Sequence, residues 1–166
     1  MQSIKCLLGD PVESSQTQKK IGKLKEIVVD PDTGKLVAFL LETALPESWL
    51  SVLDILEFQE NKVLIQSEGK LMPLDDLPRV RQIKKLNIKV LGAKVFTEKG
   101  QYLGKATDLI FDEHTGEILR YYIARPLILS PLKAYLILSR DAVLRIEKKG
   151  IIVKEPEKKA PAEALI

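Results

Sequence analysis

The stretch Val29-Asp30-Pro31-Asp32-Thr33-Gly34-Lys35 (VDPDTGK) separates two apolar runs, and residues 111–117 (FDEHTGE) repeat it 82 positions later. Both copies keep the Asp, the Thr and the Gly at the same places. An Asp that opens a tight turn accepts hydrogen bonds from backbone N–H groups two residues on, and a Gly adopts positive φ without steric cost. The motif therefore predicts a hairpin corner that is used twice. Its structural turn residues are Asp30, Gly34, Asp112 and Gly116.

The repetition extends well beyond the corner. Residues 21–43 align without a gap to residues 103–125, with five identical positions. Upstream, Leu8 to Val12 (LGDPV) matches Leu91 to Val95 (LGAKV), and downstream the segment from Ser51 loosely matches the segment from Ser139. The repeated unit is about 70 to 80 residues long, and two copies indicate two domains rather than a solenoid, which needs at least three repeats.

Each copy reads as short strands separated by turns, which is typical of a small barrel or sandwich. The sequence predicts a mainly β fold of two small β-barrels in tandem, joined by a short linker that forms one or two helical turns. We expect the first barrel at residues 1–78, the linker at 79–88 and the second barrel at 89–155. Residues 156–166 are rich in Pro, Ala, Glu and Lys and are expected to be disordered.

An ordered set of short motifs occurs in both copies: L-G-x-x-V, then [IL]-G-K, then [DE]-[IL], then D-x-x-T-G. Its glycines and lysines are Gly9, Gly22, Lys23 and Gly34 in the first copy and Gly92, Gly104, Lys105 and Gly116 in the second. Over about residues 4–155 this set resembles the PRC-barrel family, and Leu71 to Val80 (LMPLDDLPRV) resembles the linker of bacterial proteins with two such domains. The resemblance implies a small β-barrel that docks on a partner and has no shared catalytic residue.

Composition excludes several classes of protein. A formal net charge of +3 is too small to identify a nucleic-acid binder. The longest apolar run, Leu36 to Leu41, has six residues, whereas a membrane-spanning helix needs about 20. The N-terminal MQSIKCLLGD lacks the apolar core of a signal peptide. We therefore expect no membrane span and a cytoplasmic location.

Catalytic and metal chemistry is poorly supported. Cys6 and His114 are the only residues of their kinds, which excludes an intramolecular disulfide, a multi-cysteine zinc site and any site with two histidines. The acidic corners lack the longer array of oxygen ligands that a calcium loop requires. We expect no enzyme activity, no metal and no cofactor.

The two copies differ on one face of the strand that follows the corner. Alternation places Val37, Phe39 and Leu41 inside the first barrel, as it places Leu119, Tyr121 and Ile123 inside the second. The opposite face reads Leu36, Ala38, Leu40 in the first copy and Ile118, Arg120, Tyr122 in the second. Because an apolar outer face must be covered, we expect the first barrel to bury Leu36, Ala38 and Leu40 against the second barrel or another chain, including a second copy. Trp49 is expected to be a core or inter-domain plug.

A partner-docking patch is predicted in the second copy. Arg125 to Lys133 (RPLILSPLK) is an apolar loop with no counterpart in the first copy, and it follows directly after Arg120 and Tyr122. Interface centres favour Tyr, Arg and large apolar residues. The predicted docking residues are Arg120, Tyr122, Arg125, Leu127, Ile128 and Leu129.

These features favour a non-enzymatic adaptor that binds a protein partner. An RNA- or ribosome-associated maturation factor is the alternative, because the PRC-barrel family includes a domain of a ribosome maturation factor and the chain has basic pairs such as Lys84-Lys85. Against it, the basic residues are interspersed with acids and no aromatic platform accompanies them. A barrel that binds a small molecule is the third reading, although so small a barrel is normally filled by its own side chains.

Overall fold

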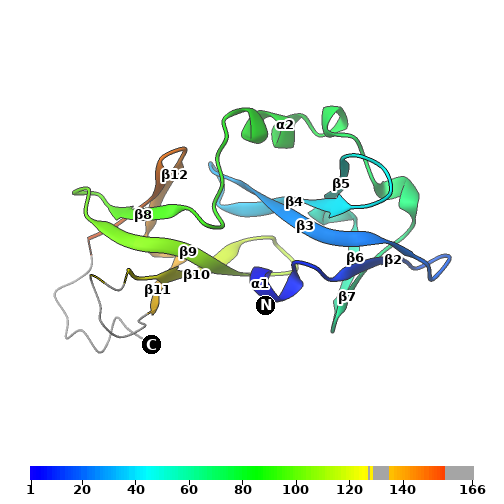
Figure 1. Cartoon of the computed structure of the whole chain (residues 1–166), viewed down its shortest axis with the longest axis horizontal. Helices are drawn as coiled ribbons and strands as arrows, with labels where there is room; N and C mark the ends of the chain where they lie inside the picture. The colour runs from blue at the N-terminus through cyan, green and yellow to red at the C-terminus, as the bar shows by residue number, and fades with distance from the viewer. Residues whose placement is uncertain (127, 129–134, 156–166) are drawn as a thin grey trace.

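The computed structural model describes residues 1–126, 128 and 135–155. These residues form two β-sheets that lie side by side along the long axis of the molecule (Figure 1). The predicted docking residues Leu127 and Leu129 and the expected disordered tail 156–166 lie outside the described residues.

The first sheet has six strands in the order β5-β4-β3-β2-β7-β6. Neighbouring strands are antiparallel except β2 and β7, which are parallel. The strands are β2 (Pro11–Ser14), β3 (Lys20–Asp30), β4 (Lys35–Glu42), β5 (Ser48–Ser51), β6 (Ile55–Gln59) and β7 (Lys62–Ile65), with the 3-10 turn η1 (Val52–Asp54) before β6.

The second sheet repeats this order as β11-β10-β9-β8-β13-β12 and gains a seventh strand, β1 (Gln2–Ser3), which pairs with β9. Its other strands are β8 (Lys94–Thr97), β9 (Tyr102–Phe111), β10 (Ile118–Ala124), β11 (Tyr135–Ser139), β12 (Val143–Glu147) and β13 (Gly150–Val153). The identical strand order confirms that the fold is mainly β and built twice.

The N-terminus joins the second sheet, although the sequence assigns it to the first barrel. The Ser3 hydroxyl donates to the Asp108 carboxylate at 2.6 Å, and the Lys5 backbone N–H donates to the same carboxylate at 2.9 Å. The short helix α1 (Ile4–Leu7) follows, and it buries Ile4 and Leu7 in the core. The first seven residues thus tie the two halves of the chain together.

A β-bulge changes which residues of β4 face inward. The pairing of β3 with β4 shifts register between Val28 and Val29, so Leu36 is buried in the core with Phe39, while Val37 is only half-buried. A bulge inserts one extra residue on one strand and therefore reverses the alternation beyond it. The predicted inward position of Val37 and the outward position of Leu36 were wrong for this reason.

The same irregularity recurs in the second sheet. The pairing of β10 with β9 shifts between Ile118 and Arg120. Ile118 is fully buried and Leu119 is half-buried, so these two residues also exchange the sides predicted for them. Tyr121 and Ile123, beyond the bulge, are buried as predicted.

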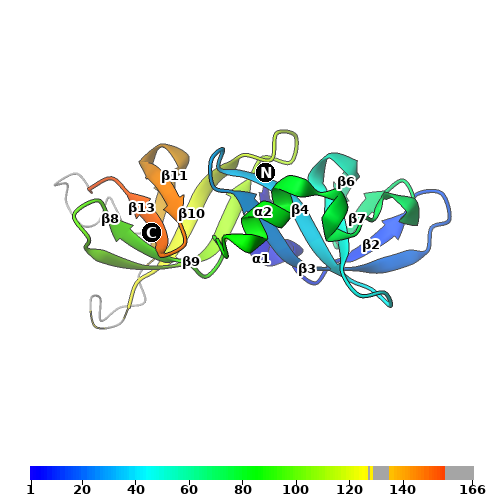
Figure 2. The same cartoon turned by 90° about the horizontal axis from the view of Figure 1, so that it is seen from above.

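The outer face of the first sheet is covered by the linker and not by the second barrel. The linker forms the turn η3 (Leu74–Asp76) and the helix α2 (Pro78–Lys85), which begins with a proline, a residue well suited to the first helical position. Figure 2 shows α2 lying across β3 and β4. Val80 and Ile83, one turn apart on α2, pack against Ala38 and Trp49.

The expected burial of the face against the second barrel or another chain is therefore corrected. Ala38 and Trp49 lie beneath α2 and Leu40 packs beside them, whereas Leu36 belongs to the main core. Trp49 also exchanges two backbone hydrogen bonds of 2.9 Å with Met72, and Lys84 Nζ lies 5.7 Å from the centroid of its ring. Trp49 is thus a core residue, as one of the two expected roles has it, in the cluster between the first sheet and α2, and it does not lie between the domains.

One hydrophobic core runs through both halves of the molecule. The largest buried side chains include Phe39 and Ile65 from the first sheet and Tyr121 and Ile123 from the second, and they belong to a single cluster. Phe58 and Phe111 meet edge to face with their ring centroids 5.5 Å apart. The two sheets are therefore packed together as one folding unit.

The two corner motifs meet at the centre of this unit. The Leu36 backbone N–H donates to the Gly116 carbonyl at 2.7 Å, and the Ile118 N–H donates to the Gly34 carbonyl at 3.3 Å. Gly34 and Gly116 are equivalent in the repeat, as are Leu36 and Ile118, so the two bonds are related by an approximate two-fold axis. The corners predicted from the sequence also form the joint between the sheets.

The first corner has an additional role as an anchor for α2. The Arg79 guanidinium donates to both carboxylate oxygens of Asp30, at 2.9 and 2.7 Å, and to Asp32 at 2.7 Å. The Asp112 carboxylate accepts instead from the backbone N–H groups of His114 and Thr115. The Asp30 side chain is only 11% exposed, whereas Arg79 is 36% exposed, so the carboxylate is the buried member of the pair.

We expect Asp30→Asn to lower the free energy of unfolding at pH 7 by about 2 kcal/mol, because it weakens charge-assisted hydrogen bonds. The hydrogen bonds from Arg79 hold the pKa of the Asp30 carboxyl below its ordinary value. This stabilisation is therefore present above the ordinary carboxyl pKa of about 3.9 and is lost as the pH falls through the lower pKa of the folded state. Urea unfolding of both proteins from pH 7 down to pH 2 should show the difference shrinking below about pH 4. A difference independent of pH would contradict the role of the charge.

Candidate docking surfaces

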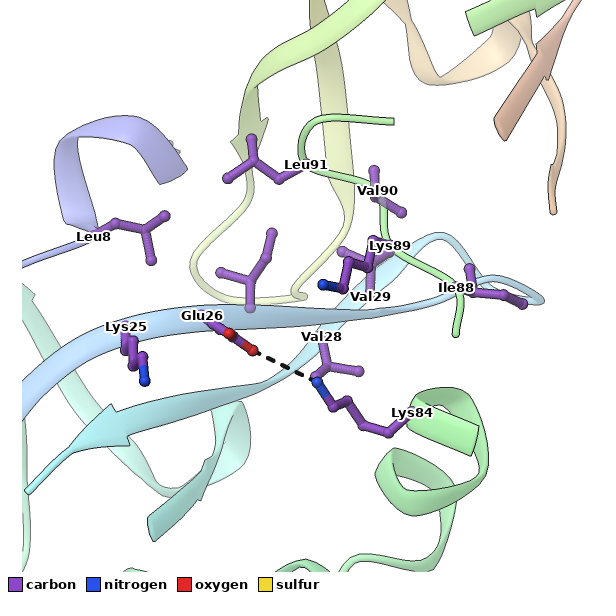
Figure 3. A pocket seen from close by; sticks show the side chains of 11 residues that line it. Leu8, Lys25, Glu26, Val28, Val29, Lys84, Ile88, Lys89, Val90 and Leu91 are labelled. Carbon is purple, nitrogen blue, oxygen red and sulfur yellow. Dashed lines mark ion pairs between the residues drawn. The ribbon is translucent and has the colours of Figure 1, made fainter. Parts of the chain in front are cut away.

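A small crevice lies between α1, β3 and the linker (Figure 3). It encloses about 200 Å³, and Lys84 Nζ lies 3.6 Å from the Glu26 carboxylate across it. The other charged residues of its lining are Lys25 and Lys89, and the lining contains neither His nor Cys. With one carboxylate already paired to a lysine, the crevice offers no acid and base set up for proton transfer.

The second candidate surface lies on β10 and β11 and is called here the open face: Arg120, Tyr122, Ile137 and Ser139. Arg120 pairs across the strands with Ser139, and Tyr122 pairs with Ile137. Arg120 and Ser139 are exposed, and the other two are half-buried. Ala38, Leu40 and Trp49 occupy the equivalent positions in the first sheet. Over that sheet α2 covers them, and α2 has no counterpart over the open face among the described residues.

The other predicted docking residues are only partly placed. Arg125 is half-buried, and its Nε atom is buried without a hydrogen-bond partner among the described residues. Ile128 is 96% exposed. The structure therefore brings Arg120 and Tyr122 together on one face and shows Ile128 in solvent.

The third surface was missed by the sequence reasoning and is called here the joint groove. It encloses about 580 Å³ where the start of β4, η1, the start of α2 and the second corner meet. Leu53 and Leu56, which line it, are 93% and 61% exposed. A signal was present in the repeat, because aligning Ser51 with Ser139 sets the apolar pair Val52-Leu53 against the charged pair Arg140-Asp141.

The described residues form neither a metal-ligand cluster nor a membrane-spanning helix. No group of three or more His, Cys, Asp or Glu side chains in residues 1–126, 128 and 135–155 could hold a metal ion. His114 is exposed on the second corner, where its backbone N–H donates to Asp112 at 2.7 Å. None of the helices in the described part of the chain is long and apolar enough to cross a membrane.

Each half of the chain matches the same known protein family. The family model described as PRC-barrel domain matches residues 3–72 and again residues 89–160. The first match ends at Met72, the residue that pairs with Trp49, and the second begins just before β8. The two matches leave α2 between them. No curated protein matches the sequence.

Proposed function

Because the chain belongs to the PRC-barrel domain family and carries two such domains in tandem, we propose that it is a non-enzymatic docking module that binds a protein partner through the open face. The observation that carries the proposal is the difference between the two outer faces. The first is apolar and is sealed by α2, with Ala38 fully buried. The second presents an exposed arginine at the position equivalent to Ala38.

The chemistry of the open face suits a protein interface. Arg120 supplies a planar cation that can pair with a carboxylate, and Tyr122 supplies an aromatic surface with a polar tip. Ile137 lies beside Tyr122 on the neighbouring strand and adds apolar area. Tryptophan, tyrosine and arginine carry most of the binding energy of many interfaces, especially where they lie near the centre and neighbouring contacts exclude water.

We expect Arg120→Glu combined with Tyr122→Ser to reduce capture of the partner from the source cells at least tenfold, because the double change removes the cation and the aromatic ring together. Lys148→Glu is the matched control, since it makes the same charge change at an exposed position in the β12–β13 turn. Quantitative mass spectrometry of affinity eluates from the three baits measures the effect. Recovery of the same proteins in the same amounts by all three would overturn the proposal.

RNA binding is the competing function, and three lysines around the crevice of Figure 3 are the observation in its favour. Binding through phosphates weakens steeply as salt rises. Retention of total cellular RNA on the immobilised chain at about 50 mM salt, with release at high salt, would support this function and count against the docking module.

A further inference from the structure

The joint groove lies where both domains contribute to one concave surface. Its first-domain wall consists of the start of β4, η1 and the start of β6, and Leu77 to Val80 form a second wall. Glu113, His114 and Thr115, at the corner of the second domain, complete the lining. A volume of about 580 Å³ is within the range of sites that take up side chains or small ligands.

Two leucines at this groove are unusually exposed. Leu53 is 93% exposed and Leu56 is 61% exposed, although the fold has a large core that could bury them. Val52, between them and β5, is partly buried against that core. Exposed apolar residues that gather beside a groove mark binding sites more often than scattered ones do. The η1 turn therefore displays apolar side chains that its own domain leaves in water.

At the equivalent position, the second domain has an ion pair between two of its own residues. There Arg140 takes the place of Val52, and Glu117 takes the place of Lys35. Arg140 Nη1 lies 2.6 Å from a Glu117 carboxylate oxygen, so the second domain supplies both members of this ion pair itself. In the first domain an ion pair cannot form between a valine and a lysine. Lys35 has no carboxylate within 4.0 Å of its ammonium group among the described residues.

The charged residues that line the joint groove indicate where a bound segment places its own charge. Lys35 is exposed and lines the groove. The Arg79 guanidinium is already paired with Asp30 and Asp32. The Glu113 carboxylate keeps its charge, because its partner at 3.0 Å is the neutral Gln2 side-chain amide, so a carboxylate of a bound segment must lie at Lys35 and away from Glu113. The groove therefore offers Leu53 and Leu56 for apolar contact and Lys35 for pairing with a carboxylate.

We propose that the joint groove is a second docking site, which binds an acidic and apolar peptide segment of a protein partner. The segment places large apolar side chains on Leu53 and Leu56. It places a carboxylate on Lys35, and so forms an ion pair where Glu117 and Arg140 form one in the second domain. This inference rests on the proposed docking function, and it adds a site between the two domains, apart from the open face.

Selection of peptides on the full chain tests the proposal. A random library of 12-residue peptides displayed on phage is selected on the intact protein, with no counter-selection on any variant. We expect the enriched peptides to carry at least two large apolar residues and a net negative charge. Their affinity, measured by fluorescence anisotropy, should fall at least tenfold with Leu53→Ser and about fivefold with Lys35→Glu, which reverses the charge that the carboxylate meets. Because Leu53 is 93% exposed, its replacement leaves the fold intact.

Matched variants separate this site from the open face. Leu144→Ser changes the counterpart of Leu56 in the second domain, where the leucine is 42% exposed, and it should leave the affinity unchanged. Arg120→Glu, on the open face, should also leave it unchanged. The joint groove is overturned if no enriched peptide depends on Leu53, or if the enriched peptides are net positive. It is equally overturned if they depend on Arg120 and not on Leu53, an outcome that would leave the docking function itself standing.

Discussion

Replacing Ala38 with Asp should lower the free energy of unfolding by about 4 kcal/mol, because it places an unpaired carboxylate in a sealed apolar site. Ala38 is fully buried between the sheet and α2, and it packs with Val80, Ile83 and Trp49. Val80 and Ile83 offer the carboxylate no hydrogen bond, and the buried indole N–H of Trp49 is a single neutral donor. Either the carboxyl group therefore stays protonated or α2 lifts off the sheet. We expect α2 to lift, since the helix is only eight residues long and short helices depend on tertiary packing.

The repeat supplies a matched control for Ala38→Asp. Arg120 occupies the equivalent position in the second domain and is exposed, so Arg120→Asp should change the free energy of unfolding by less than about 0.5 kcal/mol. Urea unfolding followed by Trp49 fluorescence reports on both variants, because the indole lies directly under α2. Equal effects of the two substitutions would mean that α2 does not seal the first outer face.

The sequence predicts that the face around Ala38 is covered, but it does not identify α2 as the element that covers it. The apolar face of β4 showed that something must lie on it, and the run after Pro78 suggested helical turns. What the sequence did not show is that these two features belong together. The helix presents only Val80 and Ile83 to the sheet, and two apolar residues one turn apart are too weak a pattern to identify a packing face. The large second domain was therefore the more obvious cover.

The bulges explain the other error in predicting which residues face the core. Alternation is reliable only within an unbroken stretch of pairing, and both β4 and β10 begin just before a shift in register. The shift exchanges Leu36 with Val37 and Ile118 with Leu119. All four residues are apolar, so the sequence contains no polar residue that would reveal the exchange. The pairing of Gln2 and Ser3 with β9 was hidden for a different reason, because a strand of two residues between distant segments leaves no periodic signal.

The joint groove differs from these cases because the sequence did contain its signal. Val52 and Leu53 align with Arg140 and Asp141 in the repeat. The exchange of a charged pair for an apolar pair at a surface turn can be recognised without a structure. What the sequence could not supply is the meeting of the two corners. That meeting brings Glu113, His114 and Thr115 of the second domain to the wall of the groove.

The approximate two-fold symmetry of the joint makes the position of each corner depend on the other. Each corner donates one backbone N–H to the other and accepts one, so neither corner can move without breaking both bonds. Both bonds involve the carbonyl of a corner glycine, and the two glycines differ in the space around them. A Cβ built on Gly116 would meet the Leu36 carbonyl oxygen at 2.8 Å, whereas a Cβ on Gly34 would meet no atom within 4 Å.

We therefore expect Gly116→Ala to lower the free energy of unfolding by about 3 kcal/mol and Gly34→Ala by only about 1 kcal/mol. Both glycines have positive φ, +77° and +69°, so both substitutions incur the cost of a left-handed conformation. Only Gly116→Ala also forces the two corners apart, which adds the loss of the joint hydrogen bonds. Hydrogen exchange distinguishes the two causes. The amides of Leu36 and Ile118 should exchange faster in Gly116→Ala at concentrations of urea where the protein is still folded, and should stay protected in Gly34→Ala. If the two variants lose stability equally and both amides stay protected, the corners are ordinary hairpin turns, and the domains are held together by the core around Phe58 and Phe111 and by the N-terminal residues that pair with β9.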